Sequence, residues 1–178
     1  MIETNRLILR QWRDEDILPF SEINRDAEVM EYLPKCLSLE ETEQFYNRIV
    51  AEHNSYGFGL YAVEIKNSGS FIGYVGFHHF DFKAEFSPGI EIGWRLAKEY
   101  WNKGYATEAA EACLDYACKY NFFKEVYSFT SVGNHRSERV MQKIGMGKVG
   151  EFDHPKLSLD SPLLRHVLYR KLLSKTIS

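Results

Sequence analysis

The sequence lacks the long apolar runs, basic tracts and paired cysteines that place a chain in a membrane, on nucleic acid or outside the cell. No stretch of its 178 residues approaches the ~18 consecutive apolar residues of a membrane-spanning helix. The N-terminal MIETNRLILR has no basic segment followed by an apolar one, so we expect no signal peptide. The net charge is −3 without a basic run, which argues against nucleic acid as a main partner.

Cysteine is also scarce. The 3 cysteines, Cys36, Cys113 and Cys118, form neither a CxxC pair nor a metal-ligand spacing. An odd number without a disulfide framework is typical of a reducing compartment, so we expect a cytoplasmic protein without bound metal. Cys113 and Cys118 lie in an apolar helical pattern, which indicates small core residues. We also expect a monomer or a homodimer.

The composition is that of an ordinary globular protein. Hydrophobic residues make up 44% of the chain and charged residues 26%. A chain of this length buries roughly 70% of the surface that its unfolded form exposes. No internal repeat or interdomain linker interrupts the sequence, so we expect one domain over residues 1–178.

Hydrophobic periodicity predicts an α+β fold in α/β/α layers: one mixed, mostly antiparallel sheet of about seven strands with helices on both faces. Pro19 interrupts the first expected helix, and the second breaks into two pieces near Pro34. Ser38 and Glu41 have the spacing of a capping box for the second piece. The expected strands lie at 6–10, 58–65, 71–80, 90–97, 126–130, 146–152 and 163–170, and the helices at 15–24, 26–53, 104–120 and 134–144.

The stretch EYWNKGYATEA places Gly104 where a strand is followed by a helix. The first turn of a helix has backbone N–H groups without partners and a positive end of the dipole, which together favour an anion such as phosphate. A glycine lets the anion approach the main chain, Ala106 keeps the surface low and Lys103 adds positive charge. The alternative is a glycine that merely begins a helix. Neither a Walker A loop nor a GxGxxG fingerprint is present.

Three further features accompany this loop. Gly93 lies in the middle of the preceding strand, where it predicts a β-bulge that would free main-chain N–H groups for a ligand. Asn134-His135-Arg136-Ser137 begins the next helix, and Lys143-Ile144-Gly145-Met146 ends it. Together they strengthen the interpretation of the Gly104 loop as a phosphate-binding site.

These segments resemble a known family. IEIGWRLAKEYWNKGYATEA followed by NHRSERVMQKIGM is similar to the GNAT superfamily of acetyl-CoA-dependent N-acetyltransferases. Within it, ETNRLILRQW and YWNKGYATEA resemble the RimJ/RimL branch, which includes enzymes that acetylate the N-terminal amine of ribosomal proteins. The resemblance extends over residues 3–170, and it implies a GNAT-like fold and acetyl-CoA as cosubstrate.

The resemblance also implies where the cofactor binds. In the family's pyrophosphate loop, Gln/Arg-x-x-Gly-x-Gly/Ala, Trp101 replaces the Gln/Arg, Gly104 is the glycine and Ala106 the last small residue. Main-chain groups of the strand would pair with the pantetheine, and Asn134 would contact the cofactor arm. The cofactor residues expected from the resemblance are Trp94, Arg95, Leu96, Asn102, Lys103, Gly104, Tyr105, Ala106, Thr107 and Asn134.

Acetyl transfer requires that the amine lose a proton, that the carbonyl oxygen be stabilised and that the thiolate leave. Glu91 is the best candidate for the base; the alternative is a solvated residue or one paired with Arg95. A backbone N–H near Gly93 is the candidate oxyanion donor. Many family members have a Tyr where this chain has Met141, and the RimJ/RimL branch suggests Ser137 as the acid instead.

The acceptor stays open between a protein N-terminal amine and a small-molecule amine such as a polyamine, an amino sugar or a drug. Residues 26–53, 78–88 and 152–163 are expected to form its groove, and acidic residues at 26–43 either attract a cationic amine or form a solvated face. His78 and His79 are expected on opposite faces of a strand, unsuited to sharing one metal. The alternatives to an enzyme are a non-catalytic CoA-binding module and an unrelated α/β nucleotide binder.

Overall fold

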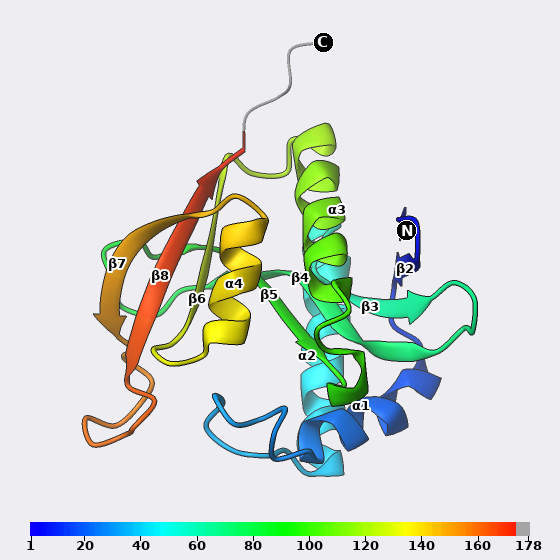
Figure 1. Cartoon of the computed structure of the whole chain (residues 1–178), viewed down its shortest axis with the longest axis horizontal. Coiled ribbons are helices and arrows are strands. Elements are labelled where there is room, and N and C mark those ends of the chain that lie inside the picture. The colour runs from blue at the N-terminus through cyan, green and yellow to red at the C-terminus, as the bar shows by residue number, and fades with distance from the viewer. Residues whose placement is uncertain (174–178) are drawn as a thin grey trace.

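Alternating hydrophobicity builds one eight-stranded sheet in the computed structural model, which describes residues 1–173 (Figure 1). The strand order is β1-β2-β3-β4-β5-β6-β8-β7, and all neighbours are antiparallel except β5 and β6. The predicted mixed, mostly antiparallel sheet is confirmed; the additional strand is the two-residue β1. The strands are β1 Ile2–Glu3, β2 Leu7–Arg10, β3 Leu60–Ile65, β4 Phe71–Phe80, β5 Gly89–Leu96, β6 Glu125–Ser131, β7 Gly147–Asp153 and β8 Arg165–Leu172.

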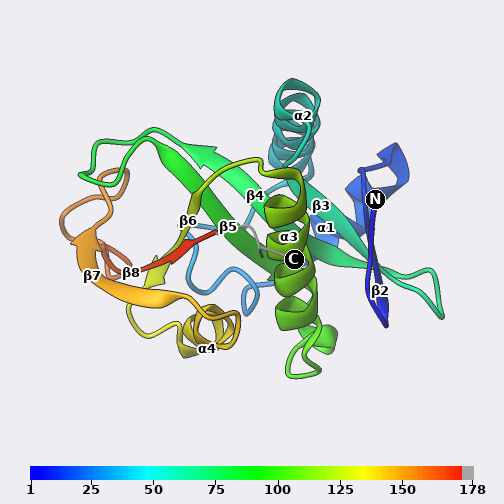
Figure 2. The same ribbon diagram turned by 90° about the horizontal axis from the view of Figure 1, so that it is seen from above.

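Helices cover both faces of the sheet, as predicted. Figure 2 shows α2 on one side of the sheet and α3 and α4 on the other. A stripe of small residues on α3, including the buried Cys113, packs on one face, and Phe20 of α1 and Ile49 of α2 pack on the other. Cys118 is only half-buried. The helices are α1 Ile17–Arg25, α2 Leu39–Tyr56, α3 Tyr105–Tyr120 and α4 His135–Lys143.

The segment 26–37 forms turns instead of the predicted first piece of a helix. The Asp26 carboxylate accepts hydrogen bonds from the N–H groups of Glu28 and Val29 at 2.8 and 3.3 Å, which competes with helical bonding. The second predicted piece is confirmed as α2, with a capping box between Ser38 and Glu41. In the view of Figure 1, residues 26–37 form a loop that lies below α4.

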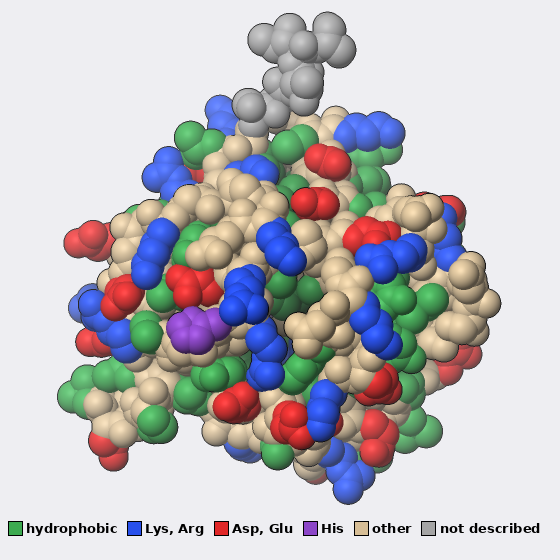
Figure 3. Space-filling view, in the orientation of Figure 1, with side chains coloured by type: hydrophobic (Ala, Val, Ile, Leu, Met, Phe, Trp, Pro, Cys, Tyr) green, Lys and Arg blue, Asp and Glu red, His purple; other side chains and the backbone are tan. Residues whose placement is uncertain are grey.

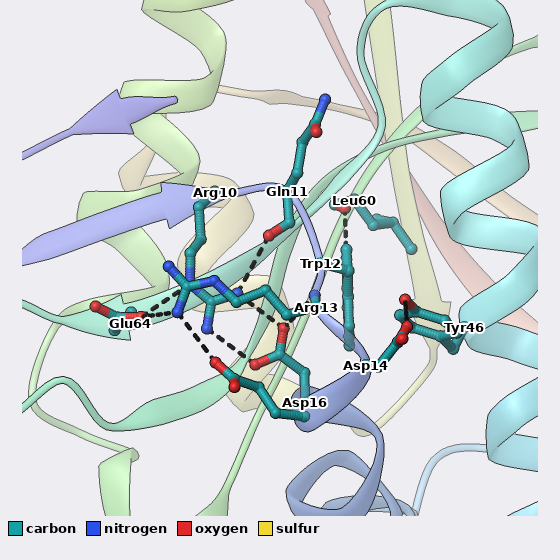
Figure 4. A network of polar contacts seen from close by, with 10 residues as sticks. Arg10, Gln11, Trp12, Arg13, Asp14, Asp16, Tyr46, Leu60 and Glu64 are labelled. Carbon is teal, nitrogen blue, oxygen red and sulfur yellow. Dashed lines mark hydrogen bonds and ion pairs between the residues drawn. The ribbon is translucent and has the colours of Figure 1, made fainter.

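Pro19 does not interrupt α1, because it lies in the first helical turn, where a backbone N–H has no intrahelical partner. A buried ion-pair network fixes where this helix begins (Figure 4). The Arg10 guanidinium donates to both oxygens of Asp16 at 2.8 and 2.9 Å, and its Nε donates to Glu64 at 2.8 Å. Chiefly through the Asp16 hydrogen bond, the network raises the pKa of Arg10 further. It joins β2, β3 and the start of α1.

The strands β5 and β6 separate at the centre of the sheet. Their parallel ladder is limited to the pair Glu91 and Tyr127, after which the Ser128 hydroxyl donates to the Ile92 carbonyl at 2.9 Å. The β4–β5 ladder, in contrast, runs without a register shift, so the predicted bulge at Gly93 is wrong. A glycine in a strand also leaves room for a neighbour, and here a Cβ on Gly93 would lie 3.8 Å from Oε1 of Glu91.

Among residues 1–173, no helix combines the length and the hydrophobicity needed to cross a bilayer.

Candidate active site

A cleft of about 400 Å³ opens where β5 and β6 separate. Its walls are β5, β6, the start of α3, the inner face of α4 and the 26–37 segment, which contributes Val29, Tyr32 and Leu33. All but one of the predicted site residues line it: Glu91, Trp94, Arg95, Leu96, Asn102, Gly104, Tyr105, Ala106, Thr107, Asn134 and Ser137.

Lys103 is the predicted residue that does not line the cleft. Its ammonium group lies 5.6 Å from the centre of the Tyr100 ring, and its carbonyl oxygen accepts a hydrogen bond from Arg6. The sequence alone could not show that the Lys103 side chain points away from the cleft, because the side chains of successive loop residues point in different directions.

Gly104 begins α3 in a left-handed conformation, with φ +82°. The first intrahelical bond runs from the Glu108 N–H to the Gly104 carbonyl at 3.0 Å, so the N–H groups of residues 105–107 precede it. A Cβ at Gly104 would lie 3.3 Å from Nη2 of Arg6. The expected helix start with a glycine beside free amides is therefore present at the floor of the cleft.

The N-terminal segment holds this loop from outside, in what we term the Arg6 tether. The Arg6 guanidinium donates to the Lys103 carbonyl at 2.9 Å and to Glu108 at 2.6 Å, and lies 4.5 Å from the Tyr105 ring centre. Thr4 donates to the same Glu108 carboxylate at 2.6 Å. These hydrogen bonds lower the pKa of Glu108, although burial opposes them. Sequence reasoning missed the tether, because its partners lie about a hundred positions apart.

Main-chain groups on one edge of β5 point into the gap between β5 and β6. The carbonyls of Ile92 and Leu96 both point away from β4, since one accepts from Ser128 and the other from Nε1 of Trp101 at 2.9 Å. Main-chain groups alternate along a strand, so the N–H and C=O of Trp94 point the same way. No ladder pair joins Trp94 to β6, which leaves this edge available to a ligand.

Three basic side chains of α4 also line the cleft: Arg136, Arg139 and Lys143. The space-filling view shows lysine and arginine side chains around a hollow in this face of the molecule (Figure 3). The Arg136 guanidinium lies 4.2 Å from the centre of the Trp101 ring and contacts Glu31 at 3.1 Å. Sequence reasoning did not select these residues, although their spacing of three and four positions puts them on one helical face.

Asn134 caps α4, as predicted: its Oδ1 accepts from the Ser137 N–H at 3.3 Å and its Nδ2 donates to Thr130 at 2.9 Å. The cap fixes the first turn of α4 at the cleft, with the half-buried Ser137 beside it. Met141 is fully buried in the core on the α3 side of the sheet, so it offers no polar group to the cleft.

Glu91 lines the cleft from the middle of the sheet. Burial raises the pKa of Glu91 to about 7, and the positive charge of His78 opposes the rise. Glu91 forms no ion pair with Arg95, whose Nη1 donates to Asn24 at 2.6 Å, among rings of Phe45 and Tyr74. The alternative of a Glu91–Arg95 pair is therefore wrong, and the carboxylate is left to titrate near neutral pH.

This burial leads to a stability prediction for Glu91→Gln. The raised pKa means that ionised Glu91 destabilises the native state increasingly as pH rises from about 4.5 to about 7, and fully above it. The variant removes this free-energy cost of ionisation, which is at most about 3 kcal/mol. The cost is smaller if water reaches the carboxylate and screens its charge. We expect the melting temperature of the ligand-free variant to exceed that of the wild type at pH 8 and to match it at pH 4.

Differential scanning calorimetry at the two pH values measures this difference. The exposed Glu85→Gln is the control, and it should leave the melting temperature unchanged at both. A Glu91→Gln variant that is destabilised at pH 8 would contradict the assignment of Glu91 as a half-buried carboxylate with a raised pKa.

The expected acceptor groove is only partly present. Of residues 26–53 only Val29, Tyr32 and Leu33 line the cleft, and no residue of 78–88 or 152–163 does so. These two segments pack against each other through Phe82, Phe86 and Phe152, beside Phe129, which does line the cleft. The acidic residues of the early region are also partly neutralised, since Glu28 pairs with Lys98 and Glu31 with Arg136.

Comparison with known proteins agrees with this geometry. The acetyltransferase (GNAT) domain family matches residues 6–147. The uncharacterized N-acetyltransferase YnaD of Bacillus subtilis is 31% identical over 151 residues, which cover 85% of each chain. A GNAT-family acetyltransferase from Bacillus anthracis has a crystal structure with a TM-score of 0.79 and 29% identity, covering 96% of this chain and 97% of that one.

Two solved structures of lower identity share the fold. RimL, a ribosomal L7/L12 α-N-protein acetyltransferase in complex with coenzyme A, has a TM-score of 0.79 at 15% identity and covers 97% of both chains. Spermidine N-acetyltransferase from Vibrio cholerae, in complex with CoA and spermine, has a TM-score of 0.76 at 20% identity, covering 98% of this chain and 100% of that one.

Proposed function

The chain belongs to the GNAT acetyltransferase family, and we propose from this that the cleft between β5 and β6 binds acetyl-CoA and that its acetyl group is transferred to a primary amine. It is thus an acyltransferase. The observation that carries the proposal is the continuous path from the open edge of β5 to the amides that begin α3 at Gly104. We further propose that residues 1–178 act as one N-acetyltransferase domain.

The cofactor would lie along this path. The amides of residues 102–107 bind the pyrophosphate, and the Trp94 carbonyl and the Leu96 N–H pair with the pantetheine in the manner of an added strand. Arg136, Arg139 and Lys143 supply positive charge for the phosphate groups from the opposite wall. Asn134 fixes the α4 wall beside the cofactor arm. Arg95 lines the path without a hydrogen bond of its own to the cofactor, because its guanidinium contacts Asn24 and its main chain faces β4.

The bound cofactor supplies an activated acetyl group, and the side chains of the cleft move the protons. Glu91, with its pKa near 7, accepts a proton from the ammonium form of the acceptor, through a water molecule where the two are not in contact. The Trp94 N–H is the oxyanion donor that replaces the one expected at a Gly93 bulge, and such a donor is worth about 3 kcal/mol. Ser137 gives its hydroxyl proton to the departing thiolate and takes one from the nitrogen that becomes the amide, so its hydroxyl is restored.

The acceptor is a primary amine of a class that the cleft does not identify. A protein N-terminal amine is supported by the resemblance to the RimJ/RimL branch, and a polyamine by the fold shared with the spermidine enzyme. The paired Glu28 and Glu31 carry less free negative charge than the sequence suggested, which favours neither class.

A thiol-release assay with acetyl-CoA tests the proposal over a panel of peptides with free N-termini, polyamines and amino sugars. We expect CoA formation that depends on at least one of these amines. Binding of CoA without turnover on any amine would instead identify a non-catalytic CoA-binding module. Thermal stabilisation by ATP or NAD but not by CoA would identify an unrelated nucleotide binder and overturn the proposal.

Ser137→Ala should lower kcat about tenfold with acetyl-CoA, because the thiolate then leaves without a proton. The cap of α4 should survive, since Asn134 accepts from the main-chain N–H of residue 137. With an acetyl thioester of a more acidic thiol, whose thiolate needs no proton, the variant should match the wild type. Ser137→Thr is the control that keeps a hydroxyl. An equal loss with both thioesters would contradict a role in thiol protonation.

A further inference from the structure

A carboxylate on α2 holds two neighbouring histidines near the end of β4. Glu52 Oε2 lies 2.7 Å from Nδ1 of His78, and its Oε1 lies 2.8 Å from Nδ1 of His79 and 2.6 Å from the His79 N–H. Burial alone would raise the pKa of Glu52, but the hydrogen bonds from His78 and His79 prevail and lower it to about 2. The cluster is therefore built around a permanently ionised carboxylate.

The convergence of the two rings was not expected for adjacent strand residues. It occurs because β3 pairs with β4 only as far as Gly76, so the edge of β4 is open at residues 78 and 79. Glu52 approaches this open edge from α2 and reaches both side chains. In residues 1–173 no group of three or more His, Cys, Asp or Glu side chains is arranged to hold a metal ion, so another role is needed.

The two histidines differ in their surroundings. His79 stacks on Tyr56 and Phe58, with ring centres 3.8 and 5.4 Å apart, and acts as a packed anchor. The His78 side chain is 50% exposed and lies directly opposite Glu91 in the β4–β5 ladder, on the same face of the sheet. Such opposite residues have Cβ atoms about 5 Å apart, a separation that one water molecule can bridge.

We propose that His78, held by Glu52, carries the proton from Glu91 to solvent in each turnover, a role that rests on the proposed acetyl transfer with Glu91 as base. Because the Glu52 carboxylate occupies Nδ1–H, the neutral ring has its lone pair on Nε2. Glu91 lines the cleft, whereas His78 does not line it and is half exposed. The two side chains thus connect the reacting amine in the cleft with solvent. His78 is a positioning residue that acts through Glu91.

The reaction requires such an exit. An ammonium acceptor and acetyl-CoA give an amide, CoA thiol and one proton, so one proton leaves the site per turnover. The ammonium group gives its proton to the Glu91 carboxylate; Glu91 passes it to His78 Nε2 through water; the imidazolium releases it to solvent, and both groups return to their starting forms.

The charges around His78 support the exchange. The Glu52 hydrogen bond raises the pKa of His78 above its ordinary value, burial opposes the rise, and Glu91 from β5 adds to it. Lys156, from the segment after β7, acts in the opposite direction. Burial raises the pKa of Glu91 to about 7 and the Glu52 hydrogen bond raises that of His78, so both groups bind a proton more readily than usual and can exchange it.

His78→Gln should lower kcat about fivefold to tenfold in dilute buffer at pH 7, less than loss of the base itself, and added imidazole should restore it. The control is His79→Gln, which removes a histidine from the same carboxylate without facing Glu91 and should keep the wild-type kcat. A His78→Gln variant with unchanged kcat, or with a loss that imidazole does not restore, would overturn the proposal. So would an equal loss in His79→Gln.

A second measurement does not depend on turnover. In the NMR titration of the histidine ring protons, Glu91→Gln should lower the pKa of His78, because the Glu91 carboxylate contributes to its rise. An unchanged His78 pKa would overturn the relay. Absence of wild-type turnover on every amine would count against acetyl transfer instead, while the titration would still decide whether His78 and Glu91 are coupled.

Discussion

Gly104→Asp is expected to weaken CoA binding at least about 100-fold, a loss of about 3 kcal/mol. Its carboxylate would lie beside the amides that begin α3, where the two negatively charged phosphates of the cofactor are proposed to bind. Loss of folding is not the expected cause. Aspartate is among the residues that best tolerate a positive φ, and it is also a good residue to begin a helix. Isothermal titration calorimetry with CoA measures the dissociation constant.

Gly69→Asp is the matched control. Gly69 has φ +69° in the turn between β3 and β4, and a Cβ there would have no neighbour within 4 Å. The Gly69→Asp variant therefore has a similar backbone strain and the same added charge as Gly104→Asp, but it lies outside the cleft. We expect a similar small loss of stability in both variants and unchanged CoA affinity in Gly69→Asp. A Gly104→Asp dissociation constant within about threefold of the wild type would refute the placement of the pyrophosphate.

Glu91→Gln is expected to lower kcat/KM about 100-fold at pH 8 on the amine that the wild type uses best. The wild-type rate should rise with pH through an inflection near 7, because only the ionised carboxylate accepts a proton. Glutamine has nearly the same shape but cannot ionise, so the variant should lose this inflection and keep only the rise that belongs to the acceptor amine. Steady-state rates from pH 5.5 to 9 test both statements.

The exposed Glu85→Gln again serves as control, with an unchanged profile. Imidazole should not restore Glu91→Gln, since the amine itself then lacks a base, which separates this defect from that of His78→Gln. If the inflection near pH 7 persists in Glu91→Gln at the wild-type amplitude, Glu91 is not the base.

The parts of the fold that depend on neighbours in the sequence were predictable. The capping box at Ser38, the N-cap at Asn134 and the helix start at Gly104 were predictable from short patterns, because the atoms involved are a few residues apart. Most cleft residues were predictable for the same reason, since they belong to one strand and to the starts of two helices.

The errors have physical causes that lie outside such patterns. Residues 26–37 have helical periodicity, but the Asp26 carboxylate offers their amides an alternative partner. Gly93 indicated a bulge, whereas the open main chain results from the separation of β5 and β6, which depends on how distant strands pair.

The remaining site contacts join residues far apart in the chain. Arg136 lies over Trp101, and Glu52 reaches both His78 and His79, although no short pattern contains either set. The sequence shows the chemical type of each of these side chains, but it does not show which side chain each one contacts.

The Arg6 tether connects the outermost edge of the sheet to the loop that begins α3. β1 has two residues and pairs only with β2, so by itself it would fray readily. Thr4 and Arg6 connect this edge to Glu108 and to the carbonyl that precedes Gly104. Energetic coupling between two sites is reciprocal, so we expect a ligand that orders the loop to slow amide hydrogen exchange at residues 2–9, and truncation before Leu7 to weaken binding of that ligand.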